Sequence, residues 1–219
     1  LKGVNLTDAN LSNANLSGAD LTGANLIGAD FSYANLSFAD FTGAHLDGAK
    51  IYFTDLRGAN FRGADLRGAD LTYANLKGYA NFTDANLTDA DLSDADLNCV
   101  TRFSIDRASL GEFISCAGRG ADLSGADLGG ANLENVELRG ANLRDANLNV
   151  ADLTFADLRA ANLVGANLSG AILNFTDLRG TDLSYANLTT TILKNAKLDG
   201  AKYCKTQMAW GELNDDCED

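Results

Sequence analysis

The sequence predicts an all-β solenoid, in which the chain winds into a stack of similar coils. Three observations support this prediction. A five-residue unit of Ala, then Asp or Asn, then Leu, then two freer residues recurs through most of the 219 residues. Arginines and aromatic residues recur at intervals of twenty, and the chain contains no proline. A backbone without proline suits coils whose amides hydrogen-bond to the coils above and below.

A period of five excludes a continuous helix or a flat strand. Each residue of an α-helix turns by about 100°, so leucines five apart spiral around the helix instead of forming one buried stripe. In a flat strand an odd period sends successive leucines to opposite faces. A short extended segment followed by a corner in every unit would point every leucine inward, and this arrangement is a solenoid.

The units form two runs separated by an irregular segment. In the first run a large apolar residue recurs every five positions from Leu1 to Leu76, and after one extra residue, Tyr79, the spacing resumes through Leu97. The second run keeps its spacing from Leu123 onward. We therefore expect one solenoid domain, 1–219, composed of a first run 1–97, an irregular insertion 98–120, a second run 121–203 and a C-terminal extension 204–219.

The length of a coil follows from similar residues that recur at twenty. Arg139, Arg159 and Arg179 are twenty apart, each beside an acidic residue, and aromatic residues show the same interval. Twenty residues are four units, so we expect a four-sided coil with one unit per side and roughly nine coils. Each coil would advance the stack by the strand spacing of about 4.8 Å.

The A(D/N)LXX unit resembles the pentapeptide-repeat family over about nine tenths of the chain. The resemblance implies a right-handed, quadrilateral parallel β-helix. In such a helix the Leu or Phe and the preceding Ala point inward and the other three residues point outward. The tail from Lys205 to Cys217 is similar to the C-terminal extension of cyanobacterial and plastid-lumen members. We therefore expect residues 204–219 to cap the solenoid.

The four cysteines lie outside the regular units, and they allow three pairings. Local pairing of Cys99 with Cys116 and of Cys204 with Cys217 needs no contact between distant coils, so we predict two disulfides. A redox or metal site is the alternative, but the chain has no CxxC motif and only one histidine, His45. We expect no metal or other cofactor.

Disulfides indicate an oxidising compartment. The repeat creates many Asn-Leu-Ser and Asn-Leu-Thr sequences, which would attract glycans to packed faces in the eukaryotic secretory route. The periplasm or the thylakoid lumen is therefore the expected location.

Two segments are candidate contact sites for a partner. In the insertion, Phe103, Leu110 and Phe113 lie near one face of an expected short helix, which either packs on the solenoid or binds another protein. In the first run, Tyr33, Phe53 and Tyr73 form an outward aromatic stripe. This stripe is either a docking surface or ring packing along the stack.

Charge and composition narrow the possible functions. The net charge of −13 disfavours direct binding to nucleic acid or to an anionic membrane surface. No stretch is long and apolar enough to be inserted into a membrane. The carboxylates repeat as a surface lattice and single out no catalytic pair, so we expect no enzyme and no catalytic residues.

Three hypotheses for function remain. The first is a monomeric, non-enzymatic scaffold that binds an unidentified protein through its regular faces or its insertion. The second follows from the family resemblance, because some pentapeptide-repeat proteins imitate DNA and bind type II topoisomerases. The third is carbohydrate or ligand binding through the exposed aromatic stripe.

Overall fold

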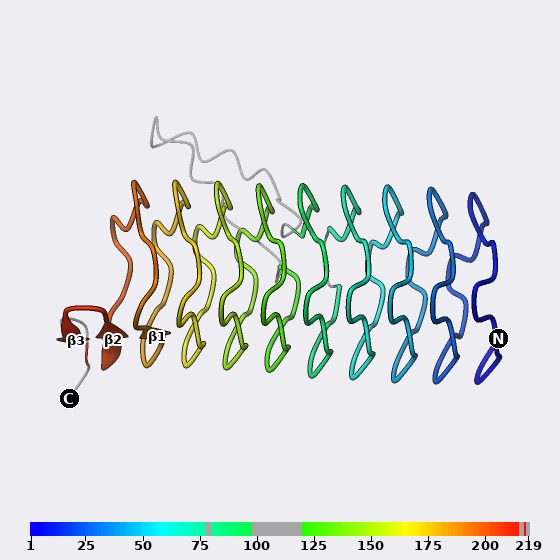
Figure 1. The fold of residues 1–219 in the computed structure, drawn as a ribbon, viewed down its shortest axis with the longest axis horizontal. Helices are drawn as coiled ribbons and strands as arrows, with labels where there is room; N and C mark the ends of the chain where they lie inside the picture. The colour runs from blue at the N-terminus through cyan, green and yellow to red at the C-terminus, as the bar shows by residue number, and fades with distance from the viewer. Residues whose placement is uncertain (78–79, 98–119, 215–216, 218–219) are drawn as a thin grey trace, which may run out of the picture.

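The chain folds into an elongated stack of coils, with its two termini at opposite ends (Figure 1). Parallel β-bridges join residues twenty apart, beginning with Asn5 and Asn25. Each five-residue unit therefore forms one of the four sides of a coil, and the predicted solenoid is confirmed. The computed structural model describes residues 1–77, 80–97, 120–214 and 217.

One side of a coil consists of a bridged residue, an inward leucine and a turn. In the unit around Leu153, the amide of Leu153 donates to the carbonyl oxygen of Ile172 in the next coil, 2.7 Å away. The amide of Ala156 then donates back to the carbonyl oxygen of Leu153 at 3.0 Å, which closes the turn. Because a corner follows each bridged residue so closely, most sides form isolated bridges rather than extended strands.

The Asp or Asn of each unit fixes the turn that follows it. Oδ1 of Asp152 accepts the backbone N–H of Thr154 at 2.9 Å and the hydroxyl of the same residue at 2.6 Å. A side-chain oxygen that accepts an N–H two residues later forms an Asx turn. Carboxylate and amide oxygens both serve this purpose, which explains why the unit accepts either residue.

The interior is filled by the leucine and alanine positions. Nearly all of them are fully buried between Leu21 and Leu188 in the described residues. Phe41, Phe61 and Phe82 replace leucine on one side, and their rings stack with centroids 4.7 and 4.8 Å apart. In the described residues the buried side chains form one cluster from Leu21 to Met208. Each buried Leu or Phe contributes about 1.5–3 kcal/mol to its stability.

Threonine replaces alanine at several buried positions. Thr176 and Thr181 are fully buried, and their hydroxyls donate to the carbonyl oxygens of Leu153 and Leu158 in the preceding coil, at 2.7 and 2.8 Å. The polar atom is thus satisfied inside the core, as burial requires.

The two interruptions change the bridge spacing but not the stacking. After the extra residue in the first run, the spacing becomes 21, as between Asn60 and Asn81. Across the insertion it becomes 41, as between Asn81 and Asp122. The coils therefore continue on both sides of the insertion. The helix predicted within residues 98–120 falls almost entirely outside the described residues.

The described residues form three strands, all near the C-terminal end: β1 (Asn187–Leu188), β2 (Thr206–Met208) and β3 (Gly211–Leu213). Strand β1 pairs with β2 in parallel, and β2 pairs with β3 in antiparallel orientation. Strand β2 continues the stacking of the coils, and its Thr206 and Met208 are buried. The β2–β3 hairpin thus lies over the last coil.

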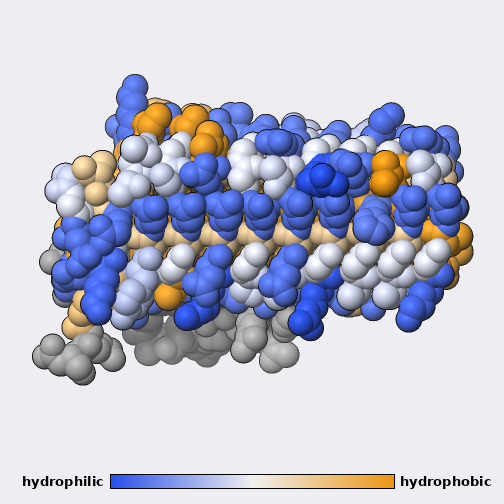
Figure 2. Space-filling model, turned by 60° about the horizontal axis from the view of Figure 1, so that its bottom comes forward, coloured by the Kyte–Doolittle hydropathy of each residue, from blue (hydrophilic) through white to orange (hydrophobic). Residues whose placement is uncertain are grey.

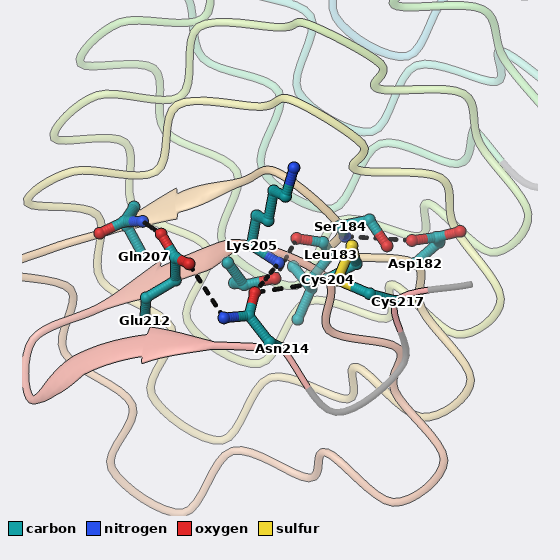
Figure 3. The surroundings of a disulfide bond; sticks show 10 residues. Asp182, Leu183, Ser184, Cys204, Lys205, Gln207, Glu212, Asn214 and Cys217 are labelled. Atoms are coloured by element: carbon teal, nitrogen blue, oxygen red, sulfur yellow. Dashed lines mark hydrogen bonds between the residues drawn. A yellow bond between two sulfur atoms is a disulfide. The ribbon is translucent and has the colours of Figure 1, made fainter. Parts of the chain in front are cut away.

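A disulfide between Cys204 and Cys217 holds the hairpin to the solenoid (Figure 3). Close to it, Oδ1 of Asn214 accepts the backbone N–H of Lys205 at 2.8 Å. This bond joins the two ends of the hairpin. The predicted pairing of these two cysteines is confirmed.

Candidate functional site

The second residue after each leucine is the corner residue of its turn, and its backbone is left-handed. Gly28 and Tyr33, in successive units, have φ values of +65° and +62°. A single positive φ at the third residue of a turn is typical of type II turns, which favour glycine there. Glycine is accordingly common at the corners, and a large side chain at a corner needs an explanation.

Five of the exposed aromatic corner residues form two stacks, and we call these five the aromatic edge. Their rings are stacked within each run: Tyr33 on Phe53 at 5.4 Å, Phe53 on Tyr73 at 4.7 Å, and Phe155 on Phe175 at 5.0 Å. Between 45% and 57% of each residue is exposed. The outward stripe predicted at Tyr33, Phe53 and Tyr73 is therefore present, although binding through it stays a prediction.

Both parts of the aromatic edge lie along the same corner. The amide of each corner residue donates to the carbonyl of the residue before the next corner residue, and these bonds lead from Tyr73 to Asp94, Asn135 and Phe155. Asp94 and Asn135 are thus the only corner residues between the two stacks. Sequence comparison at an interval of twenty missed this continuity, because the insertion changes the interval to 41. Counting whole units across the insertion would have found it.

Neighbouring groups fix the rings of the first stack. Tyr52, which precedes Phe53, packs edge-on against Tyr33 with ring centroids 5.5 Å apart. The hydroxyl of Tyr73 hydrogen-bonds to the carboxylate of Asp94, and this bond raises the pKa of Tyr73. The rings are therefore held in one orientation, with their faces against one another and their edges toward solvent.

The aromatic edge places strain on the backbone. A bulky residue with a positive φ is a genuine outlier, and the left-handed conformation costs about 1–2 kcal/mol per residue. Tyr33 and Phe53 adopt φ values of +62° and +53°. Stacking of the rings stabilises the folded state by about 0.5–1.5 kcal/mol per pair. Glycine would avoid the strain, so folding alone does not account for exposed aromatic rings at these corners.

Two further aromatic corner residues are exposed, and the sequence pattern did not predict them. Phe38 is 70% exposed, and its ring covers the Cα of Gly58 in the next coil. Tyr185 lies beneath the ammonium group of Lys205, 5.8 Å from its ring centroid. Both occupy the corner position of their units, which was the signal available in the sequence. They lie along other corners and do not extend the aromatic edge.

An alternating charge ladder follows another corner of the second run. Asp157 accepts from Arg139 at 2.9 Å and also pairs with Arg159, and Asp177 pairs with Arg179 at 2.6 Å. Burial raises the pKa of Asp157 although Arg139 opposes this effect. The hydrogen bond from Arg179 lowers the pKa of Asp177. The mutual pairing identifies the ladder as structural.

Several predicted site residues lie outside the described residues, namely Cys99, Cys116, Phe103, Leu110 and Phe113. The first disulfide and the role of the insertion therefore stay predictions.

Within the described ranges, no three or more His, Cys, Asp or Glu side chains are placed to hold a metal ion. His45 occupies an exposed Asp/Asn position and forms bridges to Asn25 and Asp65. No helix in the described part of the chain is long and apolar enough to cross a membrane.

Comparison with protein families finds a match to a model described as pentapeptide repeats. No curated protein matches the chain. The family model matches residues 1–37, 24–63, 52–78, 63–98, 119–154, 151–189 and 171–202.

Solved structures of related proteins are also similar. HetL, a pentapeptide repeat protein involved in heterocyst differentiation regulation in the cyanobacterium Nostoc, is 33% identical over 96% of this chain and 92% of its own, with a TM-score of 0.44. Full-length QnrB1, a plasmid-mediated fluoroquinolone resistance protein, is 20% identical over 91% of each chain, with a TM-score of 0.51. A pentapeptide repeat protein of the Arabidopsis thaliana thylakoid lumen is 35% identical over 57% of this chain and 68% of its own, with a TM-score of 0.28.

Proposed function

Since this chain belongs to the pentapeptide-repeat family, whose members are right-handed β-helical solenoids, we propose that it is a non-enzymatic scaffold that binds another protein through its aromatic edge. One observation carries the proposal. The five aromatic residues of this edge are exposed and have left-handed backbones, a conformation that glycine adopts without strain. Strained conformations persist where the surrounding structure imposes them, and they cluster at functional sites.

The aromatic edge has the physical properties of a binding surface. Aromatic residues dominate the energetics of protein interfaces. Because the rings of Tyr33, Phe53 and Tyr73 already hold one another in place, little side-chain entropy remains to be lost on binding. The solenoid beneath them is continuous through its hydrogen-bonded coils, so it presents the rings at fixed spacing.

The stacking disfavours carbohydrate binding through the same residues. A sugar packs its C–H groups, which carry a partial positive charge, against the negative face of an aromatic ring. In the first stack the planes of Tyr33 and Phe53 differ by 3° and those of Phe53 and Tyr73 by 7°. Both faces of Phe53 are therefore covered, and the stack offers ring edges instead.

The charge distribution gives little support to imitation of DNA. A DNA mimic needs rows of carboxylates that carry uncompensated charge. Here Asp55 pairs with Arg57 at 2.6 Å, and Asp65 pairs with Arg67 at 2.7 Å. Asp177 is likewise compensated by arginine. These arginines interrupt the acidic rows, so binding to a topoisomerase is the weaker hypothesis.

A pull-down with matched variants tests the scaffold proposal. The variant Tyr33→Gly/Phe53→Gly/Tyr73→Gly removes the first stack and relieves backbone strain, so it should fold. Tyr185→Gly removes an exposed aromatic residue from a different corner and serves as the control. We expect a partner from periplasmic or lumenal extract that the wild type and the control retain and the triple variant loses. Identical partner sets for all three proteins would refute the proposal.

We also propose that the protein resides in an oxidising compartment, either the periplasm or the thylakoid lumen. The Cys204–Cys217 disulfide supports this location, because disulfides persist in such compartments. Thiol titration of denatured, unreduced protein isolated from its natural source is the test. We expect no thiol reactivity at these two cysteines, and reactive thiols at both would refute the proposed location.

A further inference from the structure

Three carboxylates lie between the two stacks of the aromatic edge. Asp94 is the corner residue next to Tyr73, and Glu134 precedes the following corner residue. Asp91 lies in the same coil as Asp94 and forms a bridge to Asn132, two residues before Glu134. We call Asp91, Asp94 and Glu134 the acidic gap. Its charges lie between the two aromatic stacks of this corner.

Among the described residues, no lysine or arginine pairs with a carboxylate of the acidic gap. Asp94 is exposed, and Asp91 and Glu134 are partly exposed. Lys77, in the unit that follows Tyr73, is paired with Asp96 at 2.5 Å. The acidic gap therefore differs from the charge ladder, in which arginines compensate the carboxylates.

Resting on the scaffold function proposed above, we propose that the partner contributes a protein segment in which a short basic stretch separates two apolar clusters. The apolar clusters would pack on the two aromatic stacks, and the basic stretch would face the acidic gap. Complementary charge across an interface steers association and fixes register. A nucleic acid would be repelled by the same carboxylates.

The spacing of the coils defines the length of the segment. Tyr73 and Phe155 are separated by three coil steps, which is about 14 Å at the strand spacing of about 4.8 Å. An extended chain covers this distance with about four residues at about 3.3 Å each. A suitable probe is the peptide Leu-Phe-Leu-Lys-Arg-Lys-Arg-Leu-Phe-Leu, in which four basic residues separate the apolar ends.

Fluorescence anisotropy of this peptide, labelled at one end, tests the proposal. Control peptides replace the four central residues by glutamine or by glutamate. We expect the basic peptide to bind at least tenfold more tightly than the glutamine peptide at low salt, and the difference to shrink as salt screens the charges. Equal affinity of the basic and glutamine peptides, or no binding of the basic peptide, would overturn the proposal.

Variants of the protein locate the site. Asp94→Asn/Glu134→Gln removes two charges of the acidic gap, and asparagine tolerates the left-handed corner. Asp84→Asn/Asp145→Asn makes the same charge change at equivalent corner residues along a different corner, with φ values of +58° and +56°. We expect roughly tenfold weaker binding of the basic peptide by the first variant and unchanged binding by the second. Equal effects of the two variants would mean that only net charge matters, which would overturn the proposal.

The triple glycine variant of the first stack separates this inference from the scaffold function. If that variant loses peptide binding while Asp94→Asn/Glu134→Gln retains it at full strength, the aromatic edge stands and the basic chemistry of the partner is wrong. If the triple variant still binds the basic peptide as tightly as the wild type does, the aromatic edge itself is not the binding surface. Loss in both variants, with the Asp84→Asn/Asp145→Asn control unaffected, supports both proposals.

Discussion

The backbone N–H of Ala121 donates to the carbonyl oxygen of Leu97, with the nitrogen and oxygen 3.4 Å apart. In a regular unit the same bond joins an alanine to the leucine three residues earlier, as between Ala126 and Leu123 at 3.1 Å. Residues 98–120 therefore occupy the place of two turn residues. The insertion is an addition at one corner, and the coils on its two sides stack directly on each other.

Replacement of residues 98–120 by Ser-Gly should leave the solenoid intact. The two residues restore the standard turn between Leu97 and Ala121, and a shorter loop lowers the entropic cost of closing it. We expect the free energy of unfolding, measured by urea denaturation, to stay equal or to rise. A loss of more than about 2 kcal/mol would mean that the insertion supplies core contacts. The same variant in the pull-down shows whether the insertion binds the partner.

Two substitutions along one corner of the stack should change stability in opposite directions. Ala160 and Gly180 are corner residues one coil apart, with φ values of +55° and +68°, and a Cβ at Gly180 would meet no atom within 4 Å. Ala160→Gly removes left-handed strain and should stabilise the protein by up to about 1 kcal/mol. Gly180→Ala introduces that strain and should destabilise it by about 1 kcal/mol.

Thermal or urea unfolding of both variants measures these effects. Ala161→Gly, at the neighbouring buried position, is the control, because glycine there only loosens the backbone and removes a core methyl group. We expect it to be destabilising. A loss of stability in Ala160→Gly equal to that in the control would contradict the role of the corner conformation.

The sequence predicted the core well because the two inward positions of the unit recur through both runs, and the one extra residue in the first run shifts the spacing without changing the unit. An inward leucine and an inward alanine per unit suffice to derive the solenoid, and Leu153 and Ala156 illustrate both. The sequence did not show why Asp or Asn precedes leucine. That reason is local backbone geometry, namely the N–H of Thr154 that Asp152 accepts, and periodicity alone carries no information on it.

Contacts between coils were harder to predict. The sequence placed Arg139 beside Glu137, but the structure pairs Arg139 with Asp157 in the next coil. An arginine side chain is long enough to reach an acidic residue in its own unit or in the next coil. Its conformation depends on local packing that the repeat does not encode. The continuity from Tyr73 to Phe155 was missed because the insertion between their coils hides the interval of twenty.

Acidification should lower the free energy of unfolding. Hydrogen bonds from Arg57 and Arg179 lower the pKa values of Asp55 and Asp177 below the ordinary 3.8. A carboxyl whose pKa is lower in the folded state contributes stability above about pH 4, and this contribution is lost as the pH falls through the folded-state pKa. Asp157 acts in the opposite sense, because burial raises its pKa, but more carboxyls in the described residues are lowered.

Melting temperatures measured between pH 7 and pH 3 test whether stability falls as the pH falls. We expect a decrease on acidification, steepest below about pH 4. Asp177→Asn should lower stability at pH 7 by less than about 1 kcal/mol, because the ion pair is partly exposed, and should make the acid-dependent decrease smaller. A decrease in Asp177→Asn as large as that of the wild type would show that Asp177 does not contribute to it.

Removal of the C-terminal disulfide should release the hairpin and leave the rest of the solenoid folded. Cys204 and Cys217 are 13 residues apart, and in the chain-entropy model a bridge of this size contributes about 3 kcal/mol. Each coil of a solenoid contacts only its neighbours, so the loss should stay local. In Cys204→Ser/Cys217→Ser, amides of β2 and β3 should exchange faster with deuterated water, while the coil that contains Asn25 keeps its protection. Substitution is preferable to a reductant, which would also act on any bond between Cys99 and Cys116.

Faster exchange throughout the chain would contradict the local role of the disulfide. Unchanged exchange in β2 and β3 would show that the contacts of Met208 and Asn214 hold the hairpin without the disulfide.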